Sequence, residues 1–308
     1  MLAPIILFVY NRPWHTEQTL NALSKNDLAG QSILYIYADG AKSNATDEQL
    51  ETVKRVRELI KSKQWCKEVH IIETDVNKGL ANSIIDGVTQ VVNKHGKIIV
   101  LEDDILTSPF FLKYMNDGLD IYQKEEKVAC IHAYNYPVSS KGLPSTFFIK
   151  GADCWGWATW ASSWSLFEKD ANKLLNYILD NNFQYEFDLQ GSYPYTEMLK
   201  NQIENKVDSW AIRWYASAFI NNKYTLYPSV SIIYNIGLDN SGVHCGGGDN
   251  FNNKLWNNEK PVIIEKTAEI ENNKTALKRW VEYLCPNRNS WVYMLKKKAR
   301  TLVIKVCN

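Results

Sequence analysis

The stretch KIIVLEDDI, residues 97–105, predicts the fold most directly. Its apolar residues 98–101 are followed at once by Glu102, Asp103 and Asp104. A short apolar run that ends at polar residues is typical of a buried strand in a parallel sheet. Three adjacent carboxylates repel one another and lower stability unless a cation neutralises them. We therefore expect a strand with an Mn²⁺ or Mg²⁺ site at its carboxyl end; the alternative is a solvated acidic loop.

Other segments of the first half repeat this texture. Apolar, β-branched and aromatic runs occur at residues 5–10 (IILFVY), 32–38 (SILYIYA) and 68–74 (EVHIIET). Helical patterns separate the runs at 16–25, 46–62 and 80–93. Strands that alternate with helices predict an α/β fold, with a Rossmann-type, mainly parallel sheet flanked by helices. Ligands of such sheets bind beyond the carboxyl ends of the strands, where this chain has polar and acidic residues.

The second half is less regular. A helix is expected after Ser108 and Pro109, and the run KVACIHAY (127–134) predicts another strand. Beyond about Gly151 the chain is rich in tryptophan, and no linker or repeat divides it. We expect one domain over 1–250, with halves at 1–105 and 106–250, followed by a helical extension over 251–308.

Composition narrows the classes of function. The 308 residues are 45% hydrophobic, which excludes a disordered chain, and the net charge of +1 gives no general argument for nucleic acid as a partner. Aromatic residues make up 12% of the chain, which favours contacts with sugars or bases, although a large core also uses such rings. The six cysteines are scattered, so we expect free thiols in a reducing compartment. The first residues lack the features of a signal peptide, and no run is long enough to span a membrane, so we expect a cytoplasmic protein, soluble or peripheral.

Three sequence blocks carry a family resemblance. They are VLEDDILTSPFFLKYMNDGL (100–119), WGWATW (155–160) and DSWAIRW…YPSVSIIYNIG (208–237). The first resembles the EDD…P-x-F segment of the animal N-acetylglucosaminyltransferases that begin complex N-glycans, which are GT-A-fold nucleotide-sugar glycosyltransferases. The three blocks together are still more similar to bacterial polysaccharide and lipopolysaccharide glycosyltransferases of that type. The resemblance runs from Ile5 to about Gly248, and it implies a nucleotide-binding half (1–105) and an acceptor-side, catalytic half (106–250).

The resemblance implies roles for five residues at the strand ends. Arg12 corresponds to an arginine near the nucleotide diphosphate, and Asp39 to an aspartate that pairs with the base. Glu102 lies beside the donor sugar, Asp103 contacts the ribose, and Asp104 holds the metal. A guanidinium can fork onto phosphate oxygens, which agrees with the role of Arg12. The alternatives are a structural arginine at Arg12 and a turn residue at Asp39.

Two aromatic residues are candidates for sugar contacts. Trp155 and Trp157 flank a glycine that permits close approach of a ligand, so we expect them to line the donor or acceptor sugar, with burial in the core as the alternative. Trp160 and Trp164 follow at helical spacing, which predicts a helix whose buried face they occupy.

The catalytic base and a loop histidine follow from the resemblance. Asp208 corresponds to the family's catalytic base, although Ser209 replaces the acidic residue that usually follows; the alternative is an N-cap aspartate. His244 lies in a glycine-rich segment where the family places a mobile loop, and it could reach the diphosphate or the metal. The alternative for His244 is a solvated side chain.

The resemblance implies a metal-dependent, inverting glycosyltransferase. It would move a hexosyl or N-acetylhexosaminyl group from a nucleotide-sugar, with UDP-sugar favoured, to a glycan or lipid-linked oligosaccharide in surface polysaccharide synthesis. Two rivals remain. A sugar-nucleotide pyrophosphorylase needs a glycine-rich loop after the first strand, and YNRPWHTEQ (10–18) has no glycine. A non-catalytic carbohydrate-binding protein would bind glycan through the tryptophans, and its acidic residues would only hold a structural cation.

The C-terminal tail suggests a membrane surface. The segment NSWVYMLKKKARTLVIKV (289–306) mixes basic with aromatic and aliphatic residues, which suits the interface of an anionic membrane. We expect peripheral contact with the inner face of the membrane; the alternative is a helix packed on the domain.

Overall fold

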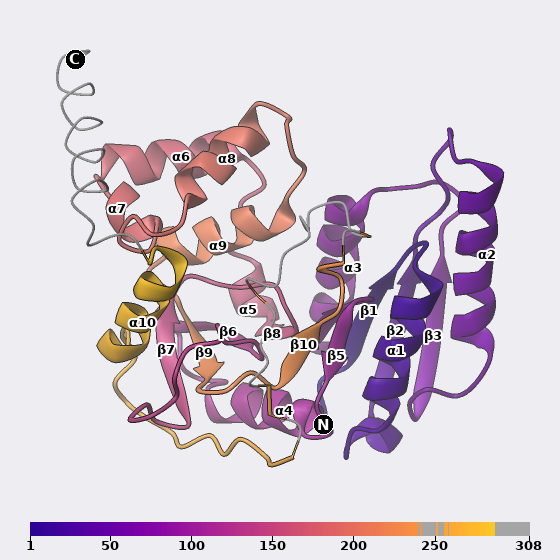
Figure 1. The fold of residues 1–308 in the computed structure, drawn as a ribbon, viewed down its shortest axis with the longest axis horizontal. Helices are drawn as coiled ribbons and strands as arrows, with labels where there is room; N and C mark the ends of the chain where they lie inside the picture. The colour runs from indigo at the N-terminus through magenta and orange to yellow at the C-terminus, as the bar shows by residue number, and fades with distance from the viewer. Residues whose placement is uncertain (240, 242–250, 252–255, 258, 287–308) are drawn as a thin grey trace.

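The computed structural model describes residues 1–239, 241, 251, 256–257 and 259–286. Its centre is an eight-stranded mixed sheet flanked by helices, which confirms the predicted α/β class (Figure 1). In spatial order the strands are β3 (Glu68–Glu73), β2 (Ile33–Ala38), β1 (Ile5–Val9), β4 (Lys97–Glu102), β8 (Trp157–Trp160), β6 (Val128–His132), β9 (Tyr224–Pro228) and β7 (Thr146–Lys150).

The first four strands form the parallel part that the sequence predicts. Strand β1 pairs in parallel with both β2 and β4, and β2 pairs in parallel with β3. Helices α1 (Pro13–Ser24) and α2 (Asp47–Lys61) pack on one face of these strands, and α3 (Leu80–His95) packs on the other. Because the chain runs outward from β1 in two directions, the carboxyl ends of β1 and β4 border the crevice where such sheets bind ligands.

The remaining strands make the sheet mixed. Strand β8 runs antiparallel to β4 and β6, β9 is parallel to β6, and β7 is antiparallel to β9. Figure 1 shows α10 beside β7, at the opposite end of the sheet from α2. The helices of this half are α4 (Phe111–Ile121), α5 (Ala161–Trp164), α6 (Ala171–Asp180), α7 (Gln184–Phe187), α8 (Tyr195–Ile203), α9 (Trp210–Ile220) and α10 (Lys274–Leu284).

A short ribbon connects the two halves at the acidic cluster. Strand β5 (Ile105–Thr107) continues directly from the acids and pairs antiparallel with β10 (Ile233–Asn235). Asn235 lies opposite Ile105, so the chain that leaves β10 passes over the end of β4.

Two local expectations can be compared with the structure. The helix predicted for Trp160 and Trp164 is the short α5, which follows Trp160 and ends at Trp164; Trp160 itself ends the strand β8, and both side chains are buried as predicted. None of the helices in the described part of the chain is long and apolar enough to cross a membrane. The tail over 289–306 lies outside the described residues.

Candidate active site

The residues after β1 and β4 form one ion-paired cluster. The Arg12 Nη2 donates to an Asp103 carboxylate oxygen and, over 2.8 Å, to Oδ2 of Asp104. The Arg12 Nε lies 3.4 Å from the second oxygen of Asp103. The third nitrogen, Nη1, is buried and has no hydrogen-bond partner among the described residues. A buried donor without a partner costs free energy, so Nη1 is a position at which a ligand oxygen would be stabilised.

Negative charge exceeds positive charge in this cluster. Burial and then the charges of Asp104 and Asp103 raise the pKa of Glu102 to about 8. Burial likewise raises the pKa of Asp103 to about 6, although Arg12 opposes the shift. On Arg12 the two aspartates outweigh burial and raise its pKa above the ordinary value. A divalent cation or another positive group would therefore be favoured beside these carboxylates.

The cluster does not form a metal cage by itself. In the described ranges no three His, Cys, Asp or Glu side chains converge as a metal site would require. Mn²⁺ and Mg²⁺ commonly take one or two carboxylates together with phosphate oxygens of the substrate. The residues present fit that arrangement, because Asp103 and Asp104 share one guanidinium whose third nitrogen is free to bind an anion.

A glycine after β10 closes over Asp104. The backbone N–H of Ile236 donates to the Asp104 carbonyl over 2.9 Å. A Cβ atom on Gly237 would lie 2.1 Å from Oδ2 of Asp104, well inside contact distance. Only glycine allows the chain to pass this close to the carboxylate. Sequence analysis missed this role, because the two residues meet only through the pairing of β5 with β10.

The same loop is held to α1 by a histidine. The buried His15 ring contacts Oδ2 of Asp239 at 3.0 Å through Nε2, and the Ser241 hydroxyl lies 3.4 Å away from that nitrogen. Hydrogen bonding from Ser241 is the main cause that lowers the pKa of Asp239 to about 2. His244 lies outside the described residues.

The Asp39 carboxylate accepts hydrogen bonds from nearby backbone N–H groups. Its Oδ1 accepts hydrogen bonds from the Gly40 and Lys78 N–H groups, both at 2.9 Å, and from the Thr74 hydroxyl at 3.1 Å. Its Oδ2 accepts from the Gly79 N–H at 3.0 Å. The carboxylate thus holds the segment before α3 at the end of β2. A nucleobase would have to donate to carboxylate oxygens that already accept hydrogen bonds from the protein. The contact of Asp39 with a base stays a prediction.

The structure separates the two candidate tryptophans. Trp157 is completely buried and stacks on Trp210, with the ring centroids 5.4 Å apart; Trp164 and Trp214 also contact it. Trp157 is therefore a core residue, and the expectation that it lines a sugar is corrected. Trp155 is only half-buried, so it remains available for contact with a ligand.

Asp208 is exposed and does not cap the helix. Ser209 occupies the N-cap of α9, and its hydroxyl accepts from the Ile212 N–H at 3.4 Å. Asp208 instead receives a hydrogen bond from Arg213 at 3.0 Å, and its side chain is 60% exposed. The N-cap alternative for Asp208 is therefore wrong. Because Trp210 stacks on Trp157, the start of α9 lies near β8, the strand that pairs with β4.

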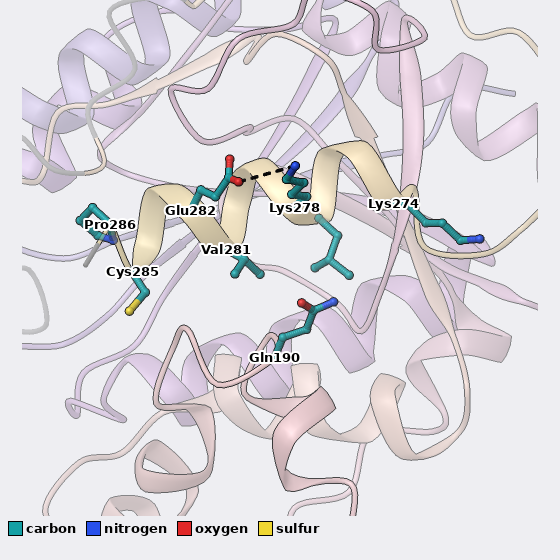
Figure 2. A pocket seen from close by; sticks show the side chains of 8 residues that line it. Gln190, Lys274, Lys278, Val281, Glu282, Cys285 and Pro286 are labelled. Carbon is teal, nitrogen blue, oxygen red and sulfur yellow. Dashed lines mark ion pairs between the residues drawn. The ribbon is translucent and has the colours of Figure 1, made fainter. Parts of the chain in front are cut away.

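A cavity open to solvent lies elsewhere. It measures about 420 Å³ and lies between α10 and the turn at Gln190 (Figure 2). Lys278 and Glu282 of α10 form an ion pair of 3.9 Å at its rim. None of the acidic-cluster residues lines this cavity, so volume alone does not locate the site.

Comparisons with known proteins give distant likenesses only. No protein-family model matches the chain, and no curated protein matches it. Among solved structures, TarS of S. aureus has 14% identity and a TM-score of 0.42, over 78% of this chain and 37% of TarS. A mannosyltransferase of Pyrobaculum calidifontis, in complex with GDP-Man and Mn²⁺, has 15% identity and a TM-score of 0.30, over 44% of this chain and 36% of its own. A UDP-glucose pyrophosphorylase complexed with UDP-glucose has 13% identity and a TM-score of 0.32, over 54% of this chain and 79% of its own. This chain thus spans less than two fifths of the first two structures. Likenesses at this level assign no function to the chain.

Proposed function

We propose that this chain is a metal-dependent nucleotide-sugar glycosyltransferase. The observation that carries the proposal is the cluster at the carboxyl ends of β1 and β4. There one guanidinium with a free, buried nitrogen lies against two carboxylates, and a third carboxylate adjoins them. A cation together with the diphosphate of a nucleotide would satisfy both the excess negative charge and the unpartnered nitrogen.

The residues of the cluster then share the work on the donor. Arg12 binds a diphosphate oxygen through Nη1, Asp104 holds Mn²⁺ or Mg²⁺, and Asp103 contacts the ribose. The metal, when bound, acts as a Lewis acid toward the departing diphosphate. Glu102 lies beside the donor sugar, and Asp39 binds the base. A UDP-sugar is the donor we favour, with a hexosyl or N-acetylhexosaminyl group as the sugar.

Transfer needs a base on the acceptor side. Asp208 accepts the proton of the acceptor hydroxyl as it attacks, which inverts the anomeric carbon. Arg213 orients the carboxylate from one turn further along α9. The acceptor we favour is a glycan or a lipid-linked oligosaccharide of a surface polysaccharide, at the inner face of the membrane.

The first experiment measures slow release of UDP from a panel of UDP-sugars with Mn²⁺. We expect release by the native chain and a fall on the order of 10²-fold in Asp104→Ala, the scale for loss of one stabilising charge. Asp117→Asn is the control, because it removes an exposed carboxylate that is paired with Lys113 on α4. Unchanged release in Asp104→Ala would remove the metal assignment. Release of pyrophosphate from a nucleoside triphosphate and a sugar phosphate would indicate a pyrophosphorylase instead.

A further inference from the structure

Another carboxylate, that of Asp153, lies near the acidic cluster, and no lysine or arginine of the described residues pairs with it. Asp153 precedes β8, and its side chain is 29% exposed. Its Oδ1 accepts the Cys154 N–H at 2.8 Å, the Cys154 thiol also bonds to the carboxylate, and Oδ2 receives a long contact of 3.4 Å from the Tyr227 hydroxyl. No lysine or arginine in the described part of the chain forms an ion pair with Asp153; the only basic side chain within 4 Å is His132, at 3.8 Å.

The hydrogen bonds of His132 make it neutral. The Trp155 backbone N–H can only donate, so the Nε2 that it contacts at 3.1 Å must accept. The Tyr134 carbonyl can only accept, so Nδ1, at 3.1 Å, carries the single ring proton. Complete burial favours the same state and lowers the pKa of His132. Asp153 therefore has no cationic partner among the described residues, and its Oδ2 can accept further hydrogen bonds from a ligand.

Several aromatic side chains lie near the Asp153 carboxylate. The half-buried Trp155 packs edge to face on Tyr134, with 4.9 Å between the ring centroids. Tyr193 is also half-buried, and after burial the charge of Asp153 is the next cause that raises its pKa. The Tyr134 hydroxyl is already bonded to the Phe251 carbonyl at 2.8 Å, so this residue offers a ring only. A carboxylate near half-buried aromatic side chains, with no lysine or arginine paired to it among the described residues, is suited to the hydroxyl groups and apolar faces of a neutral saccharide.

The carboxylate is also connected to the acidic cluster. Cys154 follows Asp153, and both Asp153 and Glu102 contribute, after burial, to the raised pKa of its thiol. Strand β8 begins at Trp157, opposite Val100 of β4, two residues before Glu102. Asp153 and the acidic cluster therefore lie at the same end of two neighbouring strands, β8 and β4.

From this placement we infer that Asp153, with Trp155 and Tyr193, forms a saccharide subsite that receives the acceptor. Asp153 accepts hydrogen bonds from sugar hydroxyls, and Trp155 offers its ring to the apolar face of the sugar. The role as acceptor subsite rests on the proposed glycosyltransferase function, whereas the binding of a saccharide does not.

The test uses the full chain without any nucleotide. Saturation-transfer NMR would measure the binding of methyl glycosides of glucose, galactose, mannose and N-acetylglucosamine. We expect at least one to bind the native chain, and Asp153→Asn to weaken its Kd by about 10-fold or more. Asn keeps the acceptor for the Cys154 N–H, so the loop should fold as before, which thermal unfolding would verify. Asp117→Asn should bind like the native chain.

Two results would overturn the inference: no methyl glycoside binds the native chain, or Asp153→Asn binds as tightly as the native chain. Failure of the glycosyltransferase proposal looks different, since it is the absence of UDP release from every UDP-sugar. In an active enzyme, Asp153→Asn should raise the KM for the bound glycoside while donor hydrolysis stays unchanged. A fall in kcat with an unchanged KM would instead place Asp153 in the chemical step and contradict a binding role.

Discussion

At the scale of single residues, the contact between Gly237 and Asp104 offers a sharp test of the site. Gly237→Ala adds a Cβ that would lie 2.1 Å from Oδ2 of Asp104, so the carboxylate or the loop must move. We expect Mn²⁺ with UDP to raise the melting temperature of the native chain and to lose most of that effect in this variant. Gly30→Ala is the matched control, because its new Cβ meets no atom within 4 Å. Equal ligand-induced shifts in the two variants would show that Asp104 does not bind the ligand.

The raised pKa values make a second prediction at this scale. Glu102 has a pKa of about 8 in the folded chain and an ordinary value of 4.5, so between these pH values the folded state holds more protons than the unfolded state. The free energy of unfolding should therefore fall as the pH rises from about 5 to about 8, and Asp103 adds to the fall up to about pH 6. Mn²⁺ prefers the ionised carboxylates, so its stabilising effect should grow over the same window.

Thermal unfolding at several pH values, with and without Mn²⁺, measures both trends. Glu102→Gln should flatten the metal-free slope above about pH 6, because Glu102 titrates in that range whereas Asp103 titrates near pH 6. A slope that is the same in Glu102→Gln as in the native chain would assign the pH dependence to other groups.

At the scale of elements, two adjacent residues at the start of α9 have different predicted roles: Ser209 stabilises the helix, and Asp208 acts in the chemical step. Ser209 caps α9, so Ser209→Ala should lower the free energy of unfolding by about 1 kcal/mol. Asp208 is exposed, so Asp208→Asn should change stability by no more than about 0.5 kcal/mol while it reduces transfer to acceptor by ~10²-fold or more. Urea unfolding and an acceptor assay measure the two effects. Transfer within a few-fold of the native rate in Asp208→Asn would eliminate Asp208 as the base.

At the scale of the whole molecule, the basic tail is the remaining prediction. We expect the full chain to sediment with anionic phosphatidylserine vesicles at low salt and to be released at high salt, because salt screens the attraction. A chain that ends at Pro286 keeps α10 and should lose the binding while it still hydrolyses the donor. Equal sedimentation of both chains would show that the tail is not the anchor.

Local patterns predicted the parallel part of the sheet and its acidic end. The apolar runs of β1 to β4 alternate with amphipathic helices. The strand β4 can also be recognised from its own residues, because its apolar run is followed directly by three carboxylates. Hydrophobic periodicity is a short-range property, so a single sequence can show it. The same approach failed at Trp160, which the tryptophan spacing predicts in a helix but which ends the buried strand β8.

Only the tertiary structure could bring together the residues that complete the site. Gly237 reaches Asp104 through the pairing of β10 with β5, and His15 meets Asp239 although 224 positions separate them. Asp153 lies beside the neutral His132 only because β6 pairs with the start of β8. The physical reason is the order of the strands. Which strand lies beside which is decided by burial over the whole sheet, and no local window of sequence contains that information.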